Sequence, residues 1–304
     1  MIELREEAWV VVRRCRMRRE AERYALVLAA MGITSRIHFD GERVLLLVAP
    51  SDAERARVEI AAYVRENSQP APRRLNIHPT RDAILGVAGY ACLLLFLHGA
   101  AIRDAFGIDW LSIGLARAGL IQGGELWRVL TALGLHGDGA HLLGNLAFGG
   151  LFGFLLAQLI GAGLAWLAIL LAGGVGNLLA AFLRAPDHGS VGASTAVFAA
   201  LGLLATLSWL QQTPERFRGL RRWLPFAAGA MLFAWLGTGD ERTDVLAHLT
   251  GLASGVAAGL FLAWLRPPLR ADAQPGYGLA ALLIFLLAWL VAIGSGQGFG
   301  SGQG

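Results

Sequence analysis

Four polar residues stand near the starts of apolar segments: His141, Asn145, Ser194 and His248. A serine hydroxyl is a weak nucleophile until an imidazole accepts its proton, so Ser194 and His248 are a candidate nucleophile and base. His141 and Asn145 are four residues apart, which places them on one face of a helix. Both side chains can donate hydrogen bonds to an oxyanion, as can the backbone N–H of Ser194 at a helix N-terminus. These residue types predict acyl-transfer chemistry.

The segments that carry these residues are long and apolar enough to cross a membrane. The 304 residues are 55% hydrophobic and 16% charged, whereas a soluble domain has about a quarter of its residues charged. A hydrocarbon core of about 30 Å needs about 20 helical residues. We predict an all-α polytopic membrane helix bundle with seven spans. The predicted spans are 83–102, 141–160, 164–183, 194–210, 223–237, 245–265 and 277–293.

The charges of the connecting loops predict the orientation of these spans. Cytoplasmic loops of membrane proteins are rich in arginine and lysine. The start, MIELREEAWV, lacks the basic-then-apolar order of a signal peptide, so we place the N-terminus in the cytosol. The arginine-rich loops 211–222 and 266–276 then lie inside, and the acidic loop 240–244 lies outside. The four polar residues consequently lie near the outer ends of the second, fourth and sixth spans.

Two further patterns accompany this arrangement. The long connection 103–140 lies outside and is half apolar, which suits a segment in the membrane interface. Gly251, Gly255 and Gly259 recur every fourth residue along the sixth span, so they allow another helix to approach closely. Close approach would bring His248 within reach of Ser194, although ordinary helix packing also explains such spacing.

Each polar residue also has a structural explanation. Ser194 alone is more often a helix cap, and His248 or Asn145 alone is more often a polar contact between helices. Their joint occurrence at one depth on alternate spans favours a catalytic site. His136, His98 and Asn177 receive no role beyond packing or surface positions.

The polar N-terminal part is predicted to be a separate domain. Residues 1–68 show a β-α-β-β-α order typical of a small α/β domain, with Asp40-Gly41 as a hairpin turn and Ser51 as a helix cap. We expect this domain to be cytosolic and without chemistry of its own. The remaining divisions are a linker at 69–82, a six-helix catalytic core at 83–268, an additional C-terminal helix at 269–293 and a disordered tail at 294–304.

The sequence resembles the rhomboid intramembrane serine proteases at four separated motifs. Gly192-Ala193-Ser194 is similar to the Gly-x-Ser nucleophile motif, and Ala247-His248-Leu249-Thr250-Gly251 is similar to the base motif. His136 to Asn145 resembles the motif of the second span, and Trp127-Arg128 resembles the Trp-Arg signature of the first loop. The six-helix core with one added C-terminal helix and an N-terminal cytosolic domain resembles the bacterial type.

The resemblance implies a serine endopeptidase with a Ser194–His248 dyad and no cofactor or metal. It implies an oxyanion hole of His141, Asn145 and the Ser194 N–H, with an aromatic residue, here Phe198, packed beneath the base. Thr195 departs from the family's usual glycine, so we expect a narrower space beside the nucleophile. Asp244, one turn before His248, could orient the base, but we expect an exposed position at the loop end.

The expected partners are the lipid bilayer and single-pass or polytopic membrane-protein substrates. The resemblance implies a bacterial inner membrane with the active site toward the outer face. Nucleic-acid binding is disfavoured because no basic stripe with interleaved aromatics occurs. Two alternatives remain open: a non-catalytic rhomboid-like protein that binds membrane clients, and a transporter or haem-binding bundle with His141 and His248 as ligands. A zinc protease is disfavoured because the chain lacks His-Glu-x-x-His.

Overall fold

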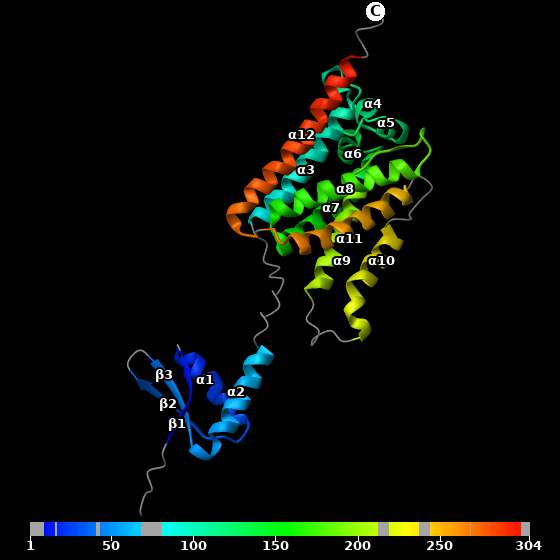
Figure 1. The fold of residues 1–304 in the computed structure, drawn as a ribbon. Coiled ribbons are helices and arrows are strands. Elements are labelled where there is room, and N and C mark those ends of the chain that lie inside the picture. Colours follow the sequence, from blue (N-terminus) through cyan, green and yellow to red (C-terminus); the bar gives the residue numbers. More distant parts are fainter. Residues whose placement is uncertain are drawn as a thin grey trace, which may run out of the picture. The chain divides into compact units, whose positions relative to one another are not determined.

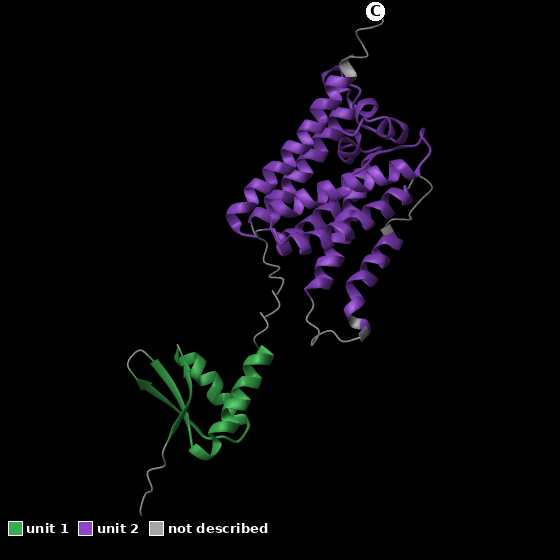
Figure 2. Cartoon of the chain, in the orientation of Figure 1, with its two compact units in different colours: residues 1–74 green, residues 75–304 purple. Residues whose placement is uncertain are grey.

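The computed structural model describes residues 9–15, 17–40, 43–67, 81–211, 219–236, 244–267 and 269–298. The chain divides into two compact units, residues 1–74 and 75–304 (Figure 2).

The N-terminal unit is a three-stranded antiparallel sheet with two helices. The strands β1 (Val10–Cys15), β2 (Ser35–Asp40) and β3 (Arg43–Val48) lie in the order β1-β3-β2. The helices α1 (Arg18–Ala30) and α2 (Ala53–Asn67) contribute Leu28 and Ile60 to a core shared with Leu46 of β3. The predicted element order is therefore confirmed.

Two local expectations for this unit have different outcomes. Asp40 pairs with Arg43 at the end of the β2–β3 register, but Gly41 of the predicted turn lies outside the described residues. The prediction that Ser51 caps the second helix is wrong. Ser51 lies inside a short 3₁₀ helix (Pro50–Asp52), which Pro50 begins because its fixed φ suits a first helical position, and α2 follows directly.

The C-terminal unit is a bundle of apolar helices (Figure 1). Its long helices are α3 (Arg81–Ile102), α7 (Gly139–Ile160), α8 (Ala162–Leu183), α9 (Ser194–Leu210), α10 (Leu224–Leu236), α11 (Val245–Leu265) and α12 (Gln274–Gly298). The predicted fold, a membrane helix bundle with a small N-terminal α/β unit, is thus confirmed.

The predicted span 194–210 coincides with α9, whereas the bounds of other helices differ from the prediction. Among the described residues, five helices are long and apolar enough to cross a membrane: α3, α7, α8, α11 and α12. α9 and α10 are shorter, at 17 and 13 residues. In addition, α12 continues to Gly298, so the predicted start of a disordered tail at Gly294 is too early. Likewise, α3 already begins at Arg81, within the predicted linker.

Helix α9 is the centre of the bundle. It packs against α7, α8, α10 and α11, and nearly all of its residues from Thr195 to Leu207 are buried. Its closest neighbour is α11, because glycines replace side chains where the two backbones meet. A Cβ at Gly251 would overlap the Thr195 carbonyl oxygen, and a Cβ at Gly255 would overlap that of Ala199. The glycine spacing therefore allows α9 and α11 to approach closely, as predicted.

The connection between α3 and α7 is a folded segment. It contains α4 (Trp110–Gly114), β4 (Ala116–Arg117), α5 (Ala118–Gln122) and α6 (Arg128–Thr131). β4 pairs antiparallel with β5 (Gly189–Ser190), which belongs to the loop between α8 and α9. This pairing links the long connection to the loop that precedes Ser194.

Helix α12 packs along α8 and also touches α4 and α6. At one end, Gln274 accepts a hydrogen bond from the Leu164 N–H (3.1 Å) and donates one to the Ile160 carbonyl (3.3 Å). Nearer the other end, the rings of Trp289 and Trp110 lie 5.2 Å apart. The additional helix thus contacts both the α7–α8 turn and the long connection.

Candidate active site

Ser194 is the first residue of α9, and three contacts hold the loop before it. β5 pairs with β4, the Gly192 N–H donates to the Ala132 carbonyl (3.0 Å), and the Ala193 N–H donates to His136 Nε2 (3.4 Å). Gly192 has φ +130°, a conformation that residues with a Cβ rarely adopt. The Ser194 N–H belongs to the first turn of α9, where backbone N–H groups lack a helical acceptor.

His141 lies beside this loop. A Cβ built on Gly192 would lie 2.5 Å from His141 Cε1 and 3.6 Å from Ser194 Oγ. The imidazole and the hydroxyl are thus both close to the Cβ position of Gly192, and only a glycine leaves room for the imidazole. The position of His141 is fixed from its backbone, because its N–H donates to the Asp138 carboxylate (2.8 Å) that caps α7.

Asn145 follows one turn later on the same helix and is buried. Its side-chain Nδ2 donates to the His141 backbone carbonyl (3.1 Å), and the Asn145 backbone carbonyl accepts a hydrogen bond from the Tyr90 hydroxyl of α3 (2.8 Å). Tyr90 in turn stacks on Trp166 of α8, with ring centroids 4.9 Å apart. This part of α7 is therefore braced by both α3 and α8.

His248 is the fourth residue of α11 and is 6% exposed. Its ring packs on Phe198 of α9, one turn after Ser194, with centroids 4.5 Å apart and planes inclined by 35°. Phe198 makes an edge-on contact with Phe233 of α10 (5.4 Å). The structure thus places Phe198 against His248, and close packing of α9 on α11 brings the first turns of the two helices together.

Thr195 does not occupy the space that the sequence led us to expect. Its side chain is 2% exposed and its methyl group points to the junction of α8, α9 and α11. A Cβ on Gly176 of α8 would lie 2.7 Å from this methyl, and one on Gly251 would lie 3.1 Å from it. Two glycines therefore make room for the threonine, so it fills a junction between helices.

Trp127 and Arg128 support the long connection. Arg128 is buried, and its Nη1 donates to the carbonyls of Ser112 and Leu115 (both 2.9 Å) while its Nε pairs with Glu125 (2.6 Å). Ser112 belongs to α4, and Leu115 directly precedes β4. Trp127 packs in an apolar cluster with Trp110 and Trp289. The two residues hold the segment that pairs with the nucleophile loop.

Two residues of this region have roles that the sequence did not reveal. His136 is buried and accepts the Ala193 N–H, and its ring lies 5.2 Å from that of His141 and 6.4 Å from that of His98. Burial, together with nearby His141 and His98, lowers the pKa of His136 to about 4. Asn177 donates to the Val129 carbonyl (2.9 Å), joining α8 to α6. The position of His136 in the His-x₄-His-x₃-Asn pattern was the available signal.

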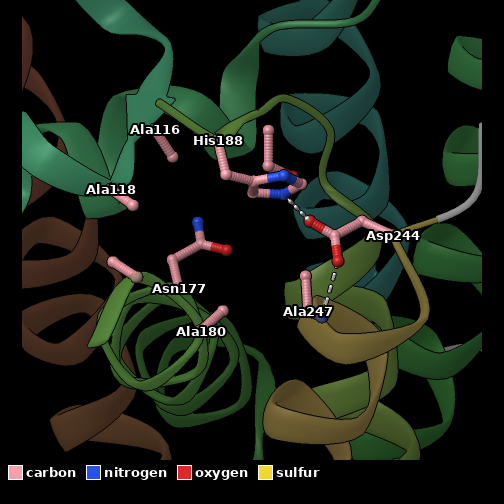
Figure 3. A pocket seen from close by; sticks show the side chains of 9 residues that line it. Ala116, Ala118, Asn177, Ala180, His188, Asp244 and Ala247 are labelled. Atoms are coloured by element: carbon pink, nitrogen blue, oxygen red, sulfur yellow. Dashed lines mark hydrogen bonds and ion pairs between the residues drawn. The ribbon is translucent and has the colours of Figure 1, made fainter. Parts of the chain in front are cut away.

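The expectation of an exposed Asp244 is wrong. Its side chain is 16% exposed because it caps α11 and pairs with two residues of the α8–α9 loop. Figure 3 shows its carboxylate between His188 and the backbone N–H of Ala247. Among the described residues, no group of three or more His, Cys, Asp or Glu side chains is arranged to hold a metal ion.

Known proteins are similar to the part of this chain that carries these residues. Residues 123–265 match the Rhomboid domain family. Rhomboid-like protease 3 of Toxoplasma gondii is 33% identical over 148 residues, which cover 48% of this chain and 55% of that protein. Rhomboid-like protease 2 of the same organism is 28% identical over 144 residues, covering 47% and 50%. The chain thus spans about half the length of these curated relatives. The region that matches the family includes Ser194, His248, His141 and Asn145, so residues 123–265 of this chain carry a Rhomboid domain.

Proposed function

We propose that this chain is an intramembrane serine endopeptidase that cleaves membrane-protein substrates through a Ser194–His248 dyad. The observation that carries the proposal is that the His141 imidazole and the Ser194 hydroxyl both lie within 4 Å of the Cβ position of Gly192. This arrangement puts a nucleophile and a hydrogen-bond donor on the same side of one loop. The names of the two relatives, both rhomboid-like proteases, add support.

The proposed reaction follows from the chemistry of these groups. His248 accepts the Ser194 proton as Oγ attacks the substrate carbonyl. The Ser194 N–H, His141 and Asn145 stabilise the oxyanion, each donor contributing roughly 10²–10³ in rate. His248 then protonates the leaving amine, and an acyl-enzyme remains on Ser194. Water, deprotonated by His248, attacks the acyl carbonyl and releases the acid. Phe198 holds the His248 ring throughout, since the two rings are packed 4.5 Å apart with their planes inclined by 35°.

The substrate class follows from the membrane setting. A transmembrane helix hides its carbonyls in hydrogen bonds, so the enzyme needs a segment that unwinds. Gly, Pro or other small residues near the outer surface of the membrane supply such a segment. We place the active site toward the outer face and the N-terminus in the cytoplasm of a bacterial cell. The arginine-rich loops 211–222 and 266–276 support this orientation through the positive-inside rule.

The first experiment is covalent labelling of the full chain in detergent with a fluorophosphonate probe. We expect wild type to be labelled and Ser194→Ala to be unlabelled, with labelling by His248→Ala reduced at least about 10³-fold because the serine loses its base. The same three proteins, reconstituted with a membrane-anchored reporter, test cleavage. Equal labelling of all three, or a folded wild type that neither labels nor cleaves, would contradict the proposal and favour a client-binding rhomboid-like protein.

A further inference from the structure

A second polar cluster joins the two elements that carry the proposed dyad. Asp244 Oδ1 accepts a hydrogen bond from Arg184 Nη2 at 2.7 Å and one from the Ala247 N–H at 3.1 Å. Asp244 Oδ2 lies 2.9 Å from His188 Nε2 (Figure 3). The side chains of Asp244, Arg184 and His188 are 16%, 33% and 34% exposed, so the cluster is partly shielded from water. We refer to these three residues as the Asp244 cluster.

The partners of Asp244 belong to the loop that ends at Ser194. Arg184 directly follows α8, and His188 directly precedes β5. The His188 carbonyl also accepts the Ala118 N–H (2.9 Å), so this residue is held from its backbone by the long connection. The loop is thus tied to β4 on one side and to Asp244 on the other.

Asp244 itself is coupled directly to the helix of the base. Its side chain caps α11, and its carbonyl accepts the backbone N–H of His248 (3.1 Å). One residue therefore fixes the first turn of α11 and binds the loop before α9. Glycine contacts between α9 and α11 begin at Gly251. The Asp244 cluster connects the two helices before that point, at their N-terminal ends.

We propose that the Asp244 cluster is a positioning device that fixes the place of His248 relative to Ser194. This inference rests on the proposed function. Asp244 acts here through other residues, because both its carboxylate oxygens are engaged by Arg184, His188 and the Ala247 N–H. It is therefore a positioning residue rather than the acid of a triad.

The charge of Asp244 persists across the pH range of an enzyme assay. Burial opposes its ionisation, but hydrogen bonds from His188, the Ala247 N–H and Arg184 outweigh this effect and lower the pKa to about 2. A depressed pKa stabilises the fold above the ordinary value of 3.8, and this stabilisation is lost only as the pH falls toward 2. The pair with His188 is ionic only when the imidazole is protonated, whereas Arg184 is always charged. Arg184 thus carries the part of the brace that does not depend on pH.

The test separates the brace from the helix cap. Asp244→Ser keeps a hydroxyl that can cap α11 but removes the carboxylate that binds Arg184 and His188. We expect kcat for reporter cleavage to fall about 10- to 100-fold, as for a displacement of His248 near 1 Å, with KM changed less than about twofold.

Arg184→Gln should also lower kcat, and Arg184→Lys should retain more of the wild-type kcat than Arg184→Gln. The loss of kcat in Arg184→Gln should be similar at pH 6 and pH 9. Asp187→Asn, an exposed acid in the same loop, is the matched control and should match wild type.

A distance measurement gives a readout that does not depend on activity. Spin labels at Ala185→Cys and Leu249→Cys, two exposed positions, report the separation of the loop from α11. The background carries Cys15→Ser and Cys92→Ser, since these are the native cysteines. We expect a narrow distance distribution that broadens in Asp244→Ser and Arg184→Gln but not in Asp187→Asn.

The outcomes distinguish the two proposals. If wild type labels at Ser194 while Asp244→Ser retains wild-type kcat and distance distribution, the positioning role is overturned and the protease assignment stands. If wild type does not react, the protease assignment fails, and broadening in Asp244→Ser then decides whether the brace exists. An unchanged distribution would overturn the brace in either case.

Discussion

At the scale of single residues, Gly192 is the position on which the proposed site depends most. Its φ of +130° and the nearness of His141 both require the absence of a side chain. The Ser194 Oγ lies 3.6 Å from the same Cβ position, so any displacement of this loop moves nucleophile and donor relative to each other. The conformation of one glycine thus links the geometry of the nucleophile to that of the oxyanion hole.

We predict that Gly192→Ala abolishes activity while most of the fold remains. The strained φ costs about 1–3 kcal/mol, and the new methyl would overlap the His141 ring. Fluorophosphonate labelling should fall at least about 100-fold because the oxyanion donor is displaced. Gly144→Ala is the control: it lies on the helix of His141, and nothing lies within 4 Å of its added Cβ. Labelling of Gly192→Ala at the wild-type rate would contradict this account of the loop.

His136 predicts a pH dependence of stability. Its lowered pKa of about 4, against an ordinary value of 6.5, means that the unfolded chain binds a proton here that the folded chain does not. Stability therefore falls as the pH falls from 6.5 to 4, by about 3 kcal/mol in total from this group. In the neutral form, His136 Nε2 accepts a hydrogen bond from the Ala193 N–H. Protonation of Nε2 would replace this acceptor with a second N–H donor and so break the hydrogen bond.

The measurement is the thermal midpoint in detergent at several values between pH 7 and pH 4.5. His136→Gln keeps an acceptor for the Ala193 N–H without a titrating ring. We expect its midpoint to decline less with falling pH than that of wild type, since contributions from other groups cancel in the comparison. Parallel curves for the two proteins would show that His136 does not titrate in this range.

At the scale of elements, helix junctions decide which residues can surround Ser194. α8, α9 and α11 meet where Gly176 and Gly251 lack side chains, and the Thr195 methyl fills that space. The Thr195 side chain is therefore accommodated between α9, α8 and α11. We expect the replacement of glycine by threonine at this position to affect helix packing more than substrate choice.

A double-mutant cycle tests this junction. Gly176→Ala would place a methyl 2.7 Å from Thr195 Cγ2 and 2.9 Å from Gly251 Cα, so we expect a loss of about 1–3 kcal/mol from overpacking. Thr195→Ser removes the methyl and should recover part of that loss. The coupling between the two changes, measured by thermal or denaturant unfolding, is expected to be about 0.5–1 kcal/mol or more. Strictly additive effects would place the Thr195 methyl elsewhere.

The sequence predicted the helices, because they follow from hydropathy, and it predicted that the four polar residues lie near helix starts. Their position toward the outer face follows from loop charges and stays a prediction. It could not predict the Asp244 cluster, since Arg184 and Asp244 are 60 residues apart and meet only in the folded bundle. The pairing of β4 with β5 was also invisible, because two-residue strands carry no periodic pattern. The direction of the Thr195 side chain depended on Gly176, a distant residue of α8.

At the scale of the whole molecule, the two compact units have separate cores. The N-terminal core is formed by the sheet and its two helices, with Leu28 and Leu46 fully buried. The α7–α9 core of the second unit is built from different residues, including Leu156 and Leu203. Units with their own cores are expected to fold independently. The residues proposed for catalysis, and the whole Rhomboid domain match, lie in the second unit.

We therefore predict that residues 75–304 retain the chemistry of the full chain. Fluorophosphonate labelling of this fragment at Ser194 should stay within about twofold of the full chain, because all the contacts described around Ser194, His141 and His248 lie within this unit. Residues 1–74 expressed alone should show the circular dichroism and cooperative melting of a folded α/β domain. Cleavage of a membrane reporter, measured beside labelling, separates chemistry from substrate capture. Equal labelling with slower cleavage would assign the N-terminal unit to substrate handling, whereas loss of labelling would show that the catalytic unit needs it to fold.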